Sequence, residues 1–157
     1  MDDGSSARLA AFLASVVDID VQPEIDDLAA LAEQPRIDAG EAVLFLACPL
    51  LPGSLLVTGD KRSLAGLQEA SESDPACARI RDRLRGKVYC FELILERILA
   101  TVGFEAIRDR LVRGRECDGG LALWVGSGLN TTEQSFQEGL ASYLSEARRT
   151  TGTMLAP

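Results

Sequence analysis

Two acidic residues of this 157-residue chain stand where carboxylate chemistry is expected. Asp60 follows the expected strand at residues 55–58 after one glycine, and Glu41 lies at the start of the helix expected before that strand. If that helix packs antiparallel to the strand, Glu41 and Asp60 share the sheet edge where α/β proteins bind ligands. Carboxylates that converge there suit Mg²⁺ or Mn²⁺, which activate water and neutralise phosphate charge in hydrolysis. The pair is therefore a candidate catalytic metal site.

Three neighbouring side chains are candidates for contacting a substrate at this edge. Thr58 offers a hydroxyl beside Asp60, and Lys61 and Arg62 are cations placed to touch a phosphate. The same positions also have a purely structural interpretation, in which the two cations are exposed residues of a helix start. Asp60 then caps that helix.

Glu41 also has a structural alternative. It follows Asp38 by three residues, which is the spacing of a capping box, in which the two side chains satisfy the free amides of a helix start. The sequence leaves both interpretations open.

The composition excludes several classes of function. The chain has no histidine, which removes Ser-His and Cys-His catalysis and imidazole metal ligands. The net charge is −8, which argues against a uniformly basic surface that grips DNA. The charge is uneven, because residues 1–41 hold ten acids and two bases while residues 60–116 hold ten acids and twelve bases. The four cysteines form no C-x-x-C pair and are expected to be reduced, and no secretory signal or membrane span is recognised, so we expect a cytoplasmic protein.

Apolar periodicity and helix caps predict alternating strands and helices, which is the pattern of an α/β domain with a parallel sheet flanked by helices. Residues 121–125 are ambiguous between helix and strand, and the residues after Thr150 are expected to fray. The expected strands cover residues 17–21, 55–58 and 88–91. The expected helices cover residues 5–16, 23–33, 38–48, 61–70, 74–85, 92–102, 105–113 and 131–149.

The segments at residues 37–42 and 55–62 together resemble the later part of PIN-like nuclease domains. Such domains are parallel α/β sheets in which three or four acids hold Mg²⁺ or Mn²⁺, and they pair an acid at a helix start with a T-x-D at the end of the next strand. The resemblance covers residues 17–91 and places Glu41 and Asp60 at those two positions. It implies a metal-dependent ribonuclease, and many members of the family are toxins of bacterial toxin–antitoxin pairs.

The resemblance also implies what the chain lacks and what it binds. No apolar strand ending in an acid precedes Ser5, so we expect an N-terminally incomplete PIN-like domain over residues 1–113 that lacks the first central strand. Residues 114–157 are expected to form a loop and a helical extension. RNA and an antitoxin-like protein are the implied partners, and the oligomeric state stays open.

Two other functions remain as alternatives to the nuclease. One is a non-catalytic α/β module that binds a protein through its C-terminal helix, because that helix has few charges between Gln134 and Tyr143. The other is a small-ligand site at the same sheet edge.

Overall fold

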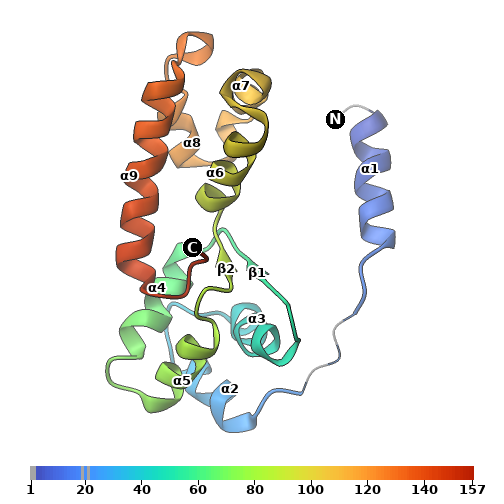
Figure 1. Ribbon diagram of the computed structural model, residues 1–157. Coiled ribbons are helices and arrows are strands. Elements are labelled where there is room, and N and C mark those ends of the chain that lie inside the picture. The colour runs from blue at the N-terminus through green and yellow to red at the C-terminus, as the bar shows by residue number, and fades with distance from the viewer. Residues whose placement is uncertain (1–2, 19, 21) are drawn as a thin grey trace.

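The protein is described here by a computed structural model, which covers residues 3–18, 20 and 22–157 (Figure 1). The described residues are mostly helical. In chain order their elements are α1 (Asp3–Ala14), α2 (Ile25–Ala32), α3 (Ala39–Leu50), β1 (Leu56–Val57), α4 (Lys61–Ala70), α5 (Pro75–Arg83), β2 (Val88–Tyr89), α6 (Phe91–Val102), α7 (Phe104–Arg113), η1 (Arg115–Cys117), α8 (Gly119–Trp124), η2 (Gly128–Asn130) and α9 (Glu133–Thr151).

The expected fold class, a PIN-like parallel sheet flanked by helices, is wrong. The described residues contain two short strands, β1 and β2, which pair in parallel with Leu56 opposite Val88. The strand pairing is parallel as expected, but Tyr89 is the last strand residue because α6 begins at Phe91. A sheet grows only where further strands pair with it, and the residues that follow β1 and β2 enter the helices α4 and α6.

The strand expected over residues 17–21 is not present among the described residues of that segment. Ile19 and Val21 lie outside the described residues, and Val17, Asp18 and Asp20 belong to neither a helix nor a strand.

The C-terminal residues close the small sheet instead of fraying. Leu155 forms a parallel bridge with Val88, whose carbonyl accepts a hydrogen bond of 2.8 Å from the amide of Ala156. Met154, Leu155 and Ala156 are all buried. The apolar triplet that follows the positive-φ turn at Gly152 therefore packs into the core.

Helices supply the rest of the core around β2. α9 packs against α4, α6 and α8, and its inner face buries Phe136, Leu140 and Leu144. Phe136 contacts the rings of both Phe104 and Trp124. The ambiguous residues 121–125 lie largely in the helix α8.

α2 is fixed to α5 by a buried carboxylate. Asp27 is 1% exposed and accepts hydrogen bonds from Arg79 at 3.0 Å and Arg83 at 3.2 Å. These two arginines therefore belong to a structural ion cluster.

α1 stands apart from the rest of the protein in Figure 1. Residues 15–24 join it to α2, and its described side chains are all exposed. Within the described part of the chain, no helix combines the length and the apolar character needed to cross a membrane.

Candidate functional site

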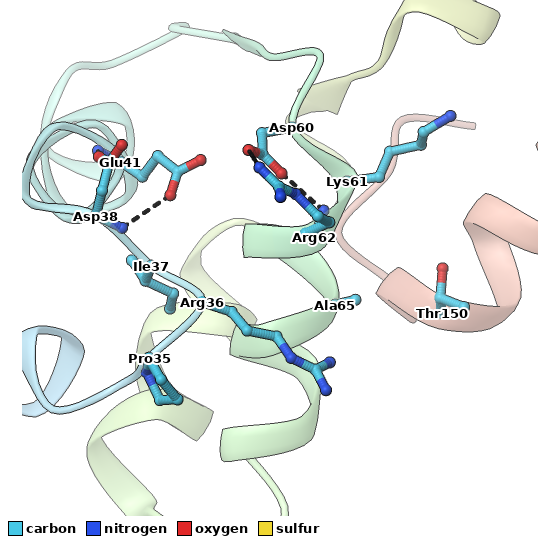
Figure 2. A pocket seen from close by; sticks show the side chains of 10 residues that line it. All are labelled: Pro35, Arg36, Ile37, Asp38, Glu41, Asp60, Lys61, Arg62, Ala65 and Thr150. Carbon is cyan, nitrogen blue, oxygen red and sulfur yellow. Dashed lines mark hydrogen bonds and ion pairs between the residues drawn. The ribbon is translucent and has the colours of Figure 1, made fainter. Parts of the chain in front are cut away.

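A pocket of about 640 Å³ opens between the N-terminal ends of α3 and α4 (Figure 2). It brings together Glu41 and Asp60, which are 19 positions apart in the sequence. The candidate residues Lys61 and Arg62 also line it, whereas Thr58 lies at its edge beside Asp60. The remaining lining residues are Pro35, Arg36, Ile37, Asp38, Ala65 and Thr150.

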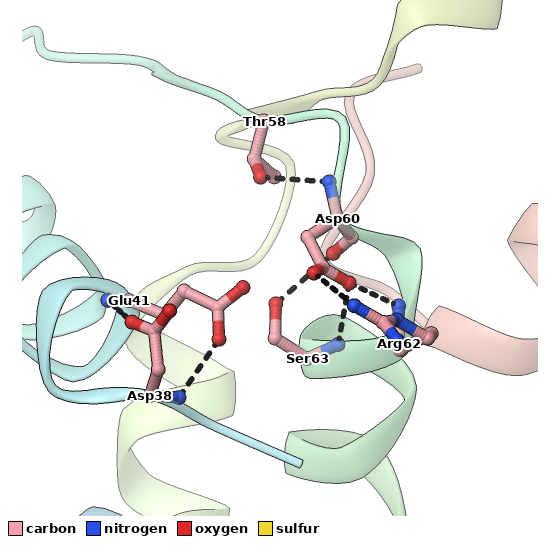
Figure 3. A network of polar contacts seen from close by, with 6 residues as sticks. All are labelled: Asp38, Glu41, Thr58, Asp60, Arg62 and Ser63. Carbon is pink, nitrogen blue, oxygen red and sulfur yellow. Dashed lines mark hydrogen bonds and ion pairs between the residues drawn. The ribbon is translucent and has the colours of Figure 1, made fainter. Parts of the chain in front are cut away.

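Glu41 reaches the pocket from the first turn of α3, where it forms a capping box. The Glu41 amide donates to Oδ1 of Asp38 at 2.8 Å, and the Asp38 amide donates to Oε2 of Glu41 at 2.9 Å. Figure 3 shows the other carboxylate oxygen of Glu41 directed across the gap toward α4. The structural alternative for Glu41 is therefore present in the molecule and leaves Oε1 facing the pocket.

Asp60 caps α4 from the opposite side of the pocket (Figure 3). Its Oδ1 accepts from the amides of Arg62 at 2.8 Å and Ser63 at 3.2 Å, and its Oδ2 accepts from Nη2 of Arg62 at 3.1 Å. The hydroxyl of Thr58 accepts a hydrogen bond of 3.1 Å from the Asp60 amide. Thr58 thus positions Asp60 through its backbone and does not contact its carboxylate.

Asp60 and Arg62 shift each other's pKa. The hydrogen bond from Arg62, followed by those from the α4 amides, lowers the pKa of Asp60 below its usual 3.8 although partial burial opposes the shift. The Asp60 carboxylate in turn raises the pKa of Arg62, and the negative charge of Glu41 adds to this effect. Arg62 is 87% exposed, so its guanidinium remains open to an anion in solution.

Lys61 points away from both carboxylates of the pocket, as Figure 2 shows. Its ammonium forms an ion pair with Glu92 and lies 5.6 Å from the ring centre of Tyr143. Glu92 is 1% exposed, and its second oxygen, Oε2, has no hydrogen-bond partner. The ammonium of Lys61 is therefore held by a buried carboxylate instead of the pocket.

Sequence reasoning missed Glu92 and Arg36. Lys61 follows β1 and Glu92 follows β2, so the parallel pairing of these strands brings the two side chains to one edge. The order of strands and charged residues was visible in the sequence, but the direct pairing of β1 with β2 was not. Arg36 lines the pocket and pairs with Glu69 at 3.0 Å, and no sequence pattern pointed to it.

The two carboxylates of the pocket are enough to bind a divalent cation if water and substrate phosphates supply its other ligands. No described group of three or more histidine, cysteine, aspartate or glutamate side chains is arranged to hold a metal ion. Mg²⁺ is nevertheless often bound by one or two carboxylates together with water and substrate phosphates. Glu41 and Asp60 supply two carboxylates on facing walls of one pocket.

No protein-family model, curated protein or solved structure matches the chain. The chemistry of the pocket is therefore argued from its own residues.

Proposed function

We propose that the chain is a metal-dependent phosphodiesterase of RNA, with its reaction site in the pocket between α3 and α4. The observation that carries the proposal is the convergence of Glu41 and Asp60 on one pocket that the cation Arg62 also lines. Carboxylates and an exposed guanidinium together form a site for a divalent cation and a phosphate group.

Each residue has a distinct part in this proposal. Glu41 and Asp60 hold Mg²⁺ or Mn²⁺, and Arg62 binds the phosphate oxygens of the substrate. Thr58 keeps Asp60 in place through the hydrogen bond from the Asp60 amide to its hydroxyl. The cation, when bound, supplies activation of water and neutralisation of phosphate charge. Lys61 has its ammonium on Glu92, so it contributes by fixing the start of α4.

The test is Mn²⁺-dependent cleavage of labelled single-stranded RNA by the full chain and two charge-removing variants. Asp60→Asn keeps a good helix cap, and Glu41→Gln keeps a residue suited to the capping box, so both are expected to fold. We expect each to lose at least about a hundredfold in cleavage rate, since removal of a metal-holding charge weakens transition-state stabilisation.

Asp74→Asn is the matched control. Asp74 caps α5 as Asp60 caps α4, accepting from the amides of Ala76 and Cys77, but it does not line the pocket. This variant should cleave RNA at the wild-type rate. A wild-type chain without Mn²⁺-dependent cleavage, or full activity of Asp60→Asn, would refute the proposal.

A second measurement separates metal binding from turnover. Mn²⁺ should raise the melting temperature of the wild-type chain, because a ligand that binds the folded state stabilises it. The rise should be lost in Asp60→Asn and kept in Asp74→Asn. An inactive chain with no such rise would favour the non-catalytic alternative.

A further inference from the structure

An apolar groove lies on α6, on the opposite side from its core contacts. We call it the α6 groove; it has a volume of about 310 Å³. Ile98 is 39% exposed and Val102 is 50% exposed, while Leu93 and Leu95 of the same helix are buried. α6 is thus apolar on two sides, which is typical of a helix that packs between two partners. The α6 groove is lined by Tyr89, Ile94, Arg97, Ile98, Thr101 and Val102.

The small sheet continues this apolar surface. Val57 pairs with Tyr89 in the parallel register, so their side chains lie on the same face of the sheet. Val57 is 63% exposed and its neighbour Leu55 is 58% exposed. Parallel sheets are normally covered on both faces, so this face lacks the layer that usually shields it.

α1 also presents an exposed apolar face. Leu9, Phe12 and Leu13 share one face of the helix, and Val16 extends that face because its amide donates to the carbonyl of Leu13. Phe12 is 65% exposed and Leu13 is 59% exposed. α1 and α6 each have 12 residues, so the two helices match in length.

The charges beside the two surfaces are opposite. Arg97 is the charged residue among those that line the α6 groove, and it already donates one hydrogen bond to Pro157. Residues 15–24, which follow α1, contain the acids Asp18, Asp20 and Glu24 and no base. Docking of α1 would bring this acidic segment toward the guanidinium of Arg97, a group that carries several N–H donors.

We propose that two copies of this chain form a dimer in which α1 of each copy packs into the α6 groove of the other. In one copy α1 is displayed away from the body, so the helix and the groove are both uncovered (Figure 1). The acids and Pro23 in residues 15–24 favour an extended linker, which presents α1 to a second molecule. Reciprocal exchange of α1 forms a closed two-fold dimer. Each copy then buries two surfaces, its own α1 and its own α6 groove, which brings the buried area closer to the roughly 800 Å² per partner that is typical of stable interfaces.

The test is the mass of the full-length protein in solution, measured by light scattering across a wide range of concentration. We expect the wild-type chain at twice its mass of 16.8 kDa. Phe12→Asp alters the donor helix and Val102→Asp alters the α6 groove, and each should weaken dimerisation by at least about tenfold because a charge enters an apolar contact. Leu123→Asp is the matched control, since Leu123 is 70% exposed on α8 and lies outside both surfaces.

Reciprocal exchange of α1 also predicts how the two variants behave when they are mixed. A mixture of Phe12→Asp, which keeps an intact groove, and Val102→Asp, which keeps an intact α1, should form a mixed dimer more readily than either variant pairs with itself. Circular dichroism checks that both variants are folded. A monomeric wild-type chain, as expected if α1 docks within its own molecule, would overturn the proposal. A dimer that both variants leave intact would also overturn it.

Discussion

Asp60 receives hydrogen bonds from two sources, the backbone of α4 and the side chain of Arg62, and the two can be separated by substitution. The amides of Arg62 and Ser63 remain when the guanidinium is removed, so α4 keeps its cap. The carboxylate, however, loses the largest cause of its lowered pKa. The charge on Asp60 and the start of the helix are therefore distinct properties of one residue.

We predict that Arg62→Ala raises the pKa of Asp60 toward its usual 3.8. A lowered pKa in the folded chain means that the unfolded chain binds the proton more tightly. The stabilisation is therefore complete above the unfolded pKa and is lost as the pH falls through the lowered value. Because Arg62 is 87% exposed, solvent screens the pair and we expect only a small loss of stability at neutral pH.

Carboxyl-carbon NMR titration of Asp60 checks this prediction. Arg81→Ala is the control, because Arg81 lowers the pKa of Asp82 and not that of Asp60. If the titration of Asp60 is unchanged in Arg62→Ala, the hydrogen bond from the Arg62 guanidinium to Asp60 is contradicted.

At the scale of elements, the ion pair between Lys61 and Glu92 joins the starts of α4 and α6. Lys61 is the first residue of α4, and Glu92 is the second residue of α6. Glu92 is almost completely buried, and the ammonium of Lys61 supplies its counter-charge. The pair links the two helices that follow the two strands.

We predict that Lys61→Met lowers the free energy of unfolding by roughly 3 kcal/mol, because it leaves a buried carboxylate without a counter-charge. The double variant Lys61→Met with Glu92→Gln should recover most of that loss, since the uncompensated charge is gone. Urea unfolding of the two variants and of Glu92→Gln alone closes a double-mutant cycle. Additive losses would show that the two side chains are not coupled.

Local features of this chain could be predicted from the sequence because they depend on residues three or four apart. The capping box of Asp38 and Glu41 and the extent of α4 over residues 61–70 are confirmed. The sheet was overestimated because the length of a strand depends on distant partners. An apolar run such as residues 88–91 does not show that a helix begins within it.

Part of the candidate site could likewise be predicted from the sequence, and part could not. The shared pocket of Glu41 and Asp60 followed from the order of helix, strand and helix. The partner of Lys61 could not be predicted from that order, because Glu92 is 31 positions away and its contact with Lys61 depends on the pairing of β1 with β2.

At the scale of the whole molecule, the chain end completes the core that the first strands leave open. The amide of Val88 donates to the carbonyl of Met154, and the amide of Gly86 donates to that of Thr153. Met154 is fully buried, and the preceding α9 packs on three other helices. The last residues thus connect the sheet to the helical part of the protein.

We predict that Met154→Ala destabilises the folded chain by about 2–5 kcal/mol, because it opens a cavity beside β2. Met154→Leu should cost less than about 1.5 kcal/mol, since it nearly conserves the volume. Leu129→Ala serves as the control, because Leu129 is 60% exposed in η2 and its truncation removes little buried surface. Urea midpoints measure all three, and equal midpoints for Met154→Ala and the wild type would mean that the chain end does not pack as described. The predicted order follows from burial alone and is independent of whether the pocket binds a metal or α1 joins two copies.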